Sequence, residues 1–170
     1  GHLKTRAKEI FVRLQEAWTS GDWEQARAYE SDRLYQVHLF WMDRYRSQGM
    51  RNHIEQVEVR GVDLVKLDRD AFFELATLRI RAAMIDYTTR GEELLAGSKS
   101  QVRGFSEYWT FMRRAGFEPG KGKEAGSCPS CGAAIKVAMD GRCEYCDANL
   151  SSGQFDWTLA KIEQDEAYAG

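Results

Sequence analysis

The sequence predicts an α+β fold, in which N-terminal helices pack on a curved antiparallel sheet that carries a small cysteine-rich insertion. Three observations lead to this prediction. Apolar residues recur at helical spacing through about the first 50 positions, and apolar and polar residues alternate afterwards. All four cysteines of the 170-residue chain lie in one short stretch near the C-terminus. Helices first and strands afterwards is the order of an α+β arrangement.

The first part of the chain predicts three helices. An apolar stripe over residues 3–18 indicates an amphipathic helix, and Asp22 is placed to cap a short second helix that begins near Trp23. A third helix is expected from Ser31 to Gly49. Its predicted inward face comprises Leu34, Val37, His38, Trp41, Met42 and Tyr45.

Alternation with period two predicts the strands. We expect them over residues 52–64, 72–88, 104–113 and 155–162, with turns at 68–70, 90–93 and 97–100. Arg60-Gly61 indicates a bulge within the first strand. The simplest sheet pairs residues 104–115 with residues 153–164 in antiparallel fashion. This pairing would make neighbours of four aromatic residues: Trp109, Phe111, Phe155 and Trp157.

The strongest chemical signal is a pair of CxxC motifs. A two-residue spacer lets one tight turn direct two thiolates at a single point, so two such turns supply the four sulfur ligands of tetrahedral zinc. The predicted ligands are Cys128, Cys131, Cys143 and Cys146. Four sulfurs close the coordination sphere, so the zinc would be structural rather than catalytic. The same ligands suit a rubredoxin-like iron site, and disulfides or a CxxC redox pair are further alternatives.

These motifs also suggest how the chain is divided. A glycine-rich segment over residues 116–127 is expected to be a linker. We therefore predict a zinc-ribbon insertion over residues 120–152 and a body formed by residues 1–119 together with 153–170. We expect the ribbon to lie away from the body, as a metal-stabilised unit too small to bury a core of its own.

Several segments resemble the prokaryotic branch of the translocase-of-inner-membrane subunit 44-like domain, within the nuclear transport factor 2-like superfamily. They are residues 31–52, 57–65, 86–88, 105–113 and 153–168, together with the cysteine finger. The resemblance implies a cone-shaped body, membrane association and partner binding, with no reaction attached. The mitochondrial relative lies peripherally on the inner membrane, binds acidic lipid and helps to tether the import motor, but it lacks the zinc finger.

Candidate contacts for a lipid or protein partner are basic. Lys4 and Lys8 lie on the first helix, which could rest on an anionic membrane or simply pack on the core. Arg79 and Arg81 share one face of a strand because they are two residues apart. These arginines could meet anionic lipid, or they could pair with acidic residues across the strand.

A cone of this kind tends to contain a pocket, and its candidate lining residues are His38, Asp86, Tyr87, Glu107 and Trp109. In an apolar pocket a carboxyl pKa can rise, so that an acid or a tyrosine hydroxyl polarises a carbonyl group, as in isomerases. Adjacent strand residues point to opposite faces, however, so Asp86 and Tyr87 cannot both enter one pocket. Each candidate is also compatible with ordinary packing.

Composition and charge restrict the function further. A net charge of −2 argues against a general nucleic-acid binder, and the sequence shows neither a signal peptide nor a membrane-spanning stretch. Because the chain opens with Gly1 rather than methionine, we expect the natural protein to be longer at its N-terminus. The resemblance implies that this parent protein is anchored in a membrane. The favoured function is a non-enzymatic domain that binds protein or lipid on the cytoplasmic side of that membrane. A small-molecule-binding or isomerase-like domain and a homodimerisation module are the alternatives.

Overall fold

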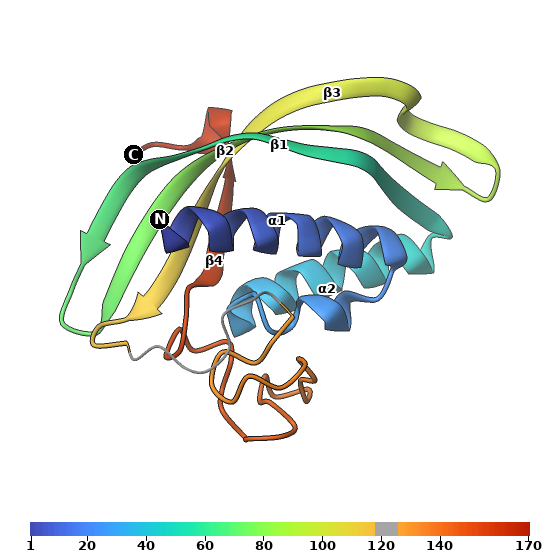
Figure 1. The fold of residues 1–170 in the computed structure, drawn as a ribbon. Helices are drawn as coiled ribbons and strands as arrows, with labels where there is room; N and C mark the ends of the chain where they lie inside the picture. Colours follow the sequence, from blue (N-terminus) through green and yellow to red (C-terminus); the bar gives the residue numbers. More distant parts are fainter. Residues whose placement is uncertain (118–125) are drawn as a thin grey trace.

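The structure, a computed structural model, describes residues 1–117 and 126–170 (Figure 1). It confirms the predicted α+β fold, with two N-terminal helices packed on a curved four-stranded antiparallel sheet, consistent with a nuclear transport factor 2-like cone. The elements are α1 (His2–Ser20), the 3-10 helix η1 (Trp23–Ala26), α2 (Asp32–Ser47), β1 (Met50–Arg69), β2 (Phe73–Arg90), β3 (Glu93–Arg114), β4 (Thr158–Gln164) and the 3-10 helix η2 (Asp165–Ala167).

The strands follow the chain order β1-β2-β3-β4, and the first three arch over α1 (Figure 1). The predicted bulge is present, because Arg60 is inserted between the pairs Val59↔Ala82 and Gly61↔Arg81. The turn predicted at residues 97–100 is instead an irregularity inside β3, where residues 98–101 lie opposite the single residue Asp86 of β2. Gly97 permits it with a φ of +78°, and a Cβ there would lie 2.1 Å from the Asp86 carbonyl oxygen.

The predicted pairing of the last two strands is confirmed from Glu107↔Gln164 to Met112↔Thr158. The predicted start of the last strand at Phe155 is wrong, because β4 begins at Thr158. The Asp156 carboxylate accepts a hydrogen bond from the Trp157 N–H at 2.7 Å, which uses the donor that a sheet ladder would need. Phe155 therefore lies in a bend before the strand.

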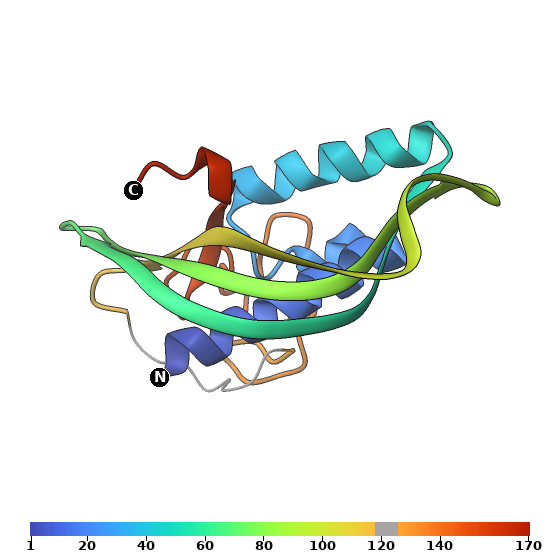
Figure 2. The ribbon, with the colours of Figure 1, turned by 90° about the horizontal axis from the view of Figure 1, so that it is seen from above.

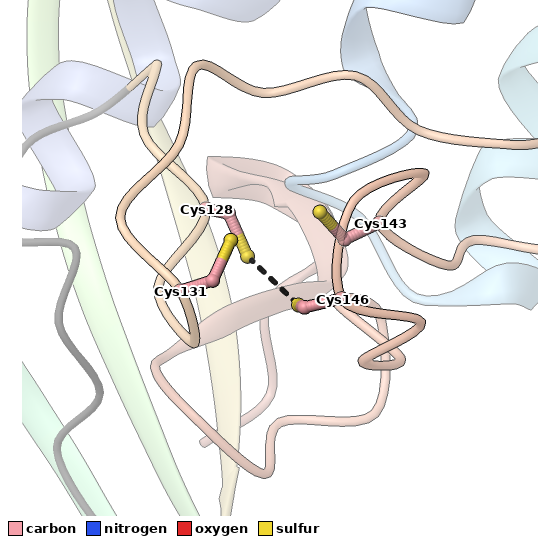
Figure 3. A group of neighbouring side chains, drawn as sticks. All are labelled: Cys128, Cys131, Cys143 and Cys146. Carbon is pink, nitrogen blue, oxygen red and sulfur yellow. Dashed lines mark hydrogen bonds between the residues drawn. The ribbon is translucent and has the colours of Figure 1, made fainter.

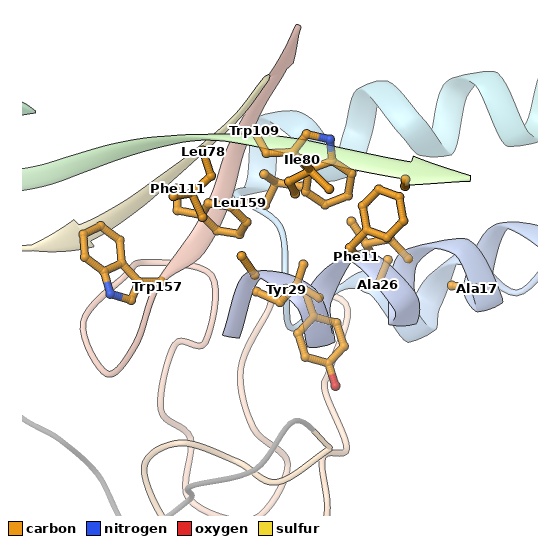
Figure 4. Packing of buried hydrophobic residues seen from close by; sticks show 14 of the residues in the cluster. Phe11, Ala17, Ala26, Tyr29, Leu78, Ile80, Trp109, Phe111, Trp157 and Leu159 are labelled. Atoms are coloured by element: carbon orange, nitrogen blue, oxygen red, sulfur yellow. The ribbon is translucent and has the colours of Figure 1, made fainter. Parts of the chain in front are cut away.

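The main core lies between α1 and the concave face of the sheet (Figure 4). The predicted stripe of α1 is buried there, and the Phe11 ring centroid lies 5.0 Å from that of Trp109. Phe111, Trp157 and Leu159 extend the same cluster toward β4. α1 ends at Gly21, which adopts the left-handed conformation with a φ of 77°.

Helix α2 is only partly covered. Ser31 caps its N-terminus by accepting a hydrogen bond from the Leu34 N–H at 3.4 Å. The predicted inward face is wrong for Val37 and Trp41, which are 45% and 47% exposed, and Phe40 beside them is 59% exposed. Seen from above, α2 lies beside the sheet rather than beneath it (Figure 2), so the sheet covers only one flank of the helix.

Candidate metal centre and cone pocket

The two CxxC motifs form equivalent turns. Cys128 accepts a hydrogen bond through its carbonyl from the Gly132 N–H, and Cys143 accepts one in the same way from the Asp147 N–H, each at 2.9 Å. Gly132 and Asp147 both have positive φ values, of 82° and 60°. The sequence analysis did not predict the left-handed conformation of Asp147. The available signal is its position directly after the second motif, which matches the position of Gly132 after the first.

The two turns bring all four thiols together (Figure 3). Their Sγ atoms lie within 4.8 Å of one another, and those of Cys128 and Cys146 are 3.8 Å apart. In a tetrahedral site with zinc–sulfur bonds of about 2.3 Å, the sulfur atoms are separated by about 3.8 Å. All four cysteines are free. The cluster could therefore hold a metal ion such as zinc.

The thiols differ in their surroundings. Burial raises the pKa of Cys128 to about 12. For Cys146, burial acts in the same direction but is outweighed by hydrogen bonds, including those from the Ala148 N–H and Ser130, which lower its pKa to about 7. Metal ligation requires thiolates, so a bound cation would release protons from the buried member of the set.

The cysteine finger does not lie away from the body, contrary to expectation. Arg27, in the segment before α2, donates a hydrogen bond from Nε to the Met139 carbonyl oxygen at 3.3 Å. On the other side, Ser151 donates from Oγ to the Asp32 carboxylate at 2.8 Å. Ala28 of the body joins the finger's own small buried cluster. The physical reason is that the finger has too few apolar residues to bury a core without its neighbour. Most of the predicted linker lies outside the described residues.

A cavity of about 430 Å³ opens between α1, α2 and the concave face of the sheet. Among the predicted candidates, His38, Asp86, Glu107 and Trp109 line it. Tyr87 does not; its hydroxyl donates to Glu55 at 2.9 Å and its ring stacks on His53. The other lining residues are Leu14, Gln15, Trp18, Trp23, Asn52, Ile54, Met84, Arg103, Phe105, Ile162 and Gln164.

The polar groups of the cavity are held by hydrogen bonds. His38 Nδ1 lies 2.5 Å from Oε1 of Glu30, a side chain with no exposed surface, and burial raises the pKa of Glu30. Asn52 donates to Asp86 at 2.8 Å. Glu107 accepts from the indole N–H of Trp109 at 2.8 Å. Sequence analysis missed Glu30, because a single acid before a helix cap carries no signal of burial.

The family is decided by the sequence profile of the Tim44-like domain, which matches residues 1–123. The chain belongs to the Tim44-like domain family. A comparison of the sequence with curated proteins found no match. Tim44-like domains are in general membrane-associated binding domains without catalytic activity. No helix in residues 1–117 or 126–170 is long and apolar enough to cross a membrane.

In this Tim44-like domain the predicted basic contacts fall into two groups. Arg79 pairs with Asp165 of η2 at 3.3 Å and Arg81 with Asp63 of β1 at 2.8 Å, so both guanidinium groups already have an acidic partner within the domain. Lys4 and Lys8 are exposed on the outer side of α1. The apolar stripe of α1 is buried in the core, however, and is not available for insertion into a membrane.

Proposed function

We propose that this Tim44-like domain is a non-enzymatic binding module that docks on an anionic membrane surface through the outer face of α2. We further propose that it belongs to a larger membrane-anchored protein and acts on the cytoplasmic side. Family membership supports a membrane-associated binding role. The single observation that points to α2 is its exposed aromatic face.

The α2 face consists of Val37, Phe40 and Trp41, flanked by Arg33 and Arg44. Three large apolar side chains on one helix, each at least 45% exposed, form a contiguous patch that sheet packing does not explain. Aromatic side chains with basic neighbours are typical of helices that lie in the membrane interface. The face therefore suits a lipid surface.

The charges of α2 complement an anionic surface. Within residues 1–117 and 126–170, neither Arg33 nor Arg44 has a carboxylate oxygen within 4.0 Å, and the Arg44 guanidinium lies 5.8 Å from the Trp41 ring centroid. The exposed acids of the helix are paired, Asp43 with Arg46 at 3.6 Å and Asp32 with Arg27 at 2.7 Å. Each basic residue near an anionic leaflet contributes about 1 kcal/mol to binding.

We also propose that the cysteine cluster is a structural zinc site. Cys128, Cys131, Cys143 and Cys146 would be its ligands, in a ribbon over residues 120–152 inserted in a body of residues 1–119 and 153–170. The sulfur separations support four-coordinate metal, and four sulfurs leave no position for a substrate. The ribbon would brace the N-terminus of α2 through Arg27 and Ser151.

The membrane proposal is tested by co-sedimentation with vesicles of phosphatidylcholine containing about one-third phosphatidylglycerol. Replacing the exposed pair with Phe40→Ser and Trp41→Ser should weaken binding at least tenfold, because the variant loses most of the apolar area that enters the interface. The matched control is Val12→Ser, which removes an exposed apolar residue from α1 and should leave binding unchanged.

Two outcomes would overturn the proposal. One is vesicle binding by the double variant that equals that of the wild type. The other is a wild-type homodimer in analytical ultracentrifugation that does not bind vesicles and that the double variant converts to a monomer. In that case the α2 face is an interface between two copies of the chain.

A further inference from the structure

The cone pocket has two polar ends joined by apolar walls. Glu107 pairs with Ile80 across the sheet, and Asp86 lies six residues further along β2, or on the order of 20 Å along an extended strand. The curvature of the sheet shortens the direct path between Glu107 and Asp86, yet a single ligand group cannot contact both carboxylates. Leu14, Ile54 and Phe105 line the cavity as well. The cavity therefore suits an elongated molecule with an apolar body.

The end near Asp86 is electrically balanced. Arg103 pairs with Met84 across the sheet, and Asp86 is two residues beyond Met84, on the same face of the strand. Both charged residues line the cavity, so one positive and one negative group lie at this end. Asn52 also donates a hydrogen bond to Asp86. No net charge is left here for a ligand to neutralise.

The end near Glu107 is different, because its carboxylate has no cationic partner among the residues that the structure describes. The donors that orient it are neutral: the indole of Trp109 at 2.8 Å and the side-chain amide of Gln164 at 3.1 Å. Within residues 1–117 and 126–170, no arginine, lysine or histidine nitrogen lies within 4.0 Å of it. Glu107 thus brings a fixed and uncompensated negative charge to the cavity.

The other titratable groups at this end do not cancel that charge. His38 lines the cavity, but its Nδ1 contacts the buried Glu30 carboxyl at 2.5 Å. Glu30 is therefore the acid that holds His38, and no contact within 4.0 Å joins His38 to Glu107 in residues 1–117 and 126–170. Trp23 packs edge-on against His38, with ring centroids 5.4 Å apart, and Trp109 adjoins Glu107. Three indole rings, those of Trp18, Trp23 and Trp109, therefore line the cavity together with the Glu107 carboxylate.

A carboxylate and aromatic rings in an apolar cavity are the groups that recognise an organic ammonium ion. We propose that the cone pocket binds an organic cation, a protonated amine with an aromatic or aliphatic body, whose ammonium group lies at Glu107. The apolar body extends between Leu14, Ile54 and Phe105 toward Asp86. An organic anion is disfavoured, because Arg103 is exposed and shares its end of the cavity with Asp86, whereas Glu107 would repel the anion.

The test compares three probes that share an indole ring and differ in the head group: tryptamine, indole-3-ethanol and indole-3-propionate. Each is titrated into isotopically labelled protein, and binding is followed through the indole N–H signals of the tryptophans in two-dimensional NMR spectra. The Trp109 N–H donates to Glu107, so it reports directly on the site. Tryptamine should bind at least tenfold more tightly than the alcohol, and the carboxylate should bind most weakly.

The matched variants are Glu107→Gln and Glu58→Gln. The first keeps the shape of the side chain and removes its charge, so it should weaken tryptamine binding about tenfold and leave indole-3-ethanol almost unchanged. The second removes an exposed carboxylate outside the cavity and should change neither affinity. Equal or tighter binding of indole-3-propionate overturns the proposal. So does a Glu107→Gln variant whose affinity for tryptamine is unchanged, or the absence of any shift of the tryptophan signals with tryptamine. None of these results depends on whether α2 binds membranes.

Discussion

Arg27 couples the cysteine finger to the cone, and replacing it should measure that coupling. Its side chain is only 6% exposed. It donates to the Met139 carbonyl in the finger at 3.3 Å and to Asp32 of α2 at 2.7 Å, and its guanidinium lies 5.0 Å from the Tyr35 ring centroid. The substitution Arg27→Met keeps the apolar stem and removes all three polar contacts.

The magnitude follows from these contacts. The bond to Met139 is worth about 1 kcal/mol, as is typical of a hydrogen bond to a neutral acceptor. The ion pair with Asp32 is worth about 1 kcal/mol rather than the value of a buried pair, because Asp32 is 68% exposed. Stacking on Tyr35 adds about 0.5–1 kcal/mol. The variant should therefore lose about 2–3 kcal/mol of unfolding free energy when metal is bound.

The assay is urea unfolding of the zinc-loaded protein and of protein treated with a chelator, with metal content measured in parallel. About one zinc per chain is expected in the loaded form. Without metal the finger no longer holds Met139 in place, so the loss caused by Arg27→Met should fall to about 1–2 kcal/mol. The control Arg33→Met, which replaces an exposed arginine nearby, should change stability by less than about 0.5 kcal/mol in both states. An equal loss for Arg27→Met with and without metal would refute the reasoning, because Arg27 would then act within the cone alone.

Two further predictions concern the backbone and the buried acid. Gly97→Ala should destabilise the protein by more than about 1 kcal/mol in thermal unfolding, because a Cβ would collide with the Asp86 carbonyl oxygen and the φ of +78° is strained for alanine. The control Gly91→Ala, with a φ of +57° and open space around the added Cβ, should lower the unfolding free energy by less. Burial raises the pKa of Glu30 above 4.5, so the folded state holds more protons than the unfolded state between pH 4.5 and that raised value. The contribution of Glu30 to stability is therefore lost as pH rises through this window. The unfolding free energy of Glu30→Gln relative to that of the wild type should accordingly increase with pH across the window. A difference between the two proteins that is constant with pH would contradict a raised pKa for Glu30.

Local patterns were sufficient to predict the elements and much of the sheet. Alternation located the strands, and the Arg60-Gly61 bulge and the pairing of the last two strands followed from glycine placement and the two-residue period. The spacing of the two CxxC motifs alone also predicted that the four cysteines lie together. These features depend on residues that are close in sequence or on the shortest antiparallel connection.

The missed features depend on contacts between distant segments. Glu30 is buried because the chain before α2 forms a bridge with Leu159, about 130 residues away in sequence, and nothing near Glu30 indicates that partner. The contacts between the finger and the body likewise depend on Arg27 and Asp32, which are distant from the finger in sequence and resemble ordinary surface charges. A motif can specify a metal cluster without specifying the surface on which that cluster rests.

The wrong prediction for α2 has a different cause, and it bears on function. Periodicity shows that a helix carries apolar residues at 3.6-residue spacing, but it does not show what covers them. On α2 these residues span an arc wider than one packed face requires: Tyr35 and Met42 face the core, and Val37, Phe40 and Trp41 face outward. A helix that serves only to cover the sheet would carry polar residues on that outer side. The surplus apolar arc on α2 therefore supports the proposed contact beyond the chain's own core. Arg33 and Arg44, which have no carboxylate oxygen within 4.0 Å in the described part of the chain, support an anionic surface as that contact.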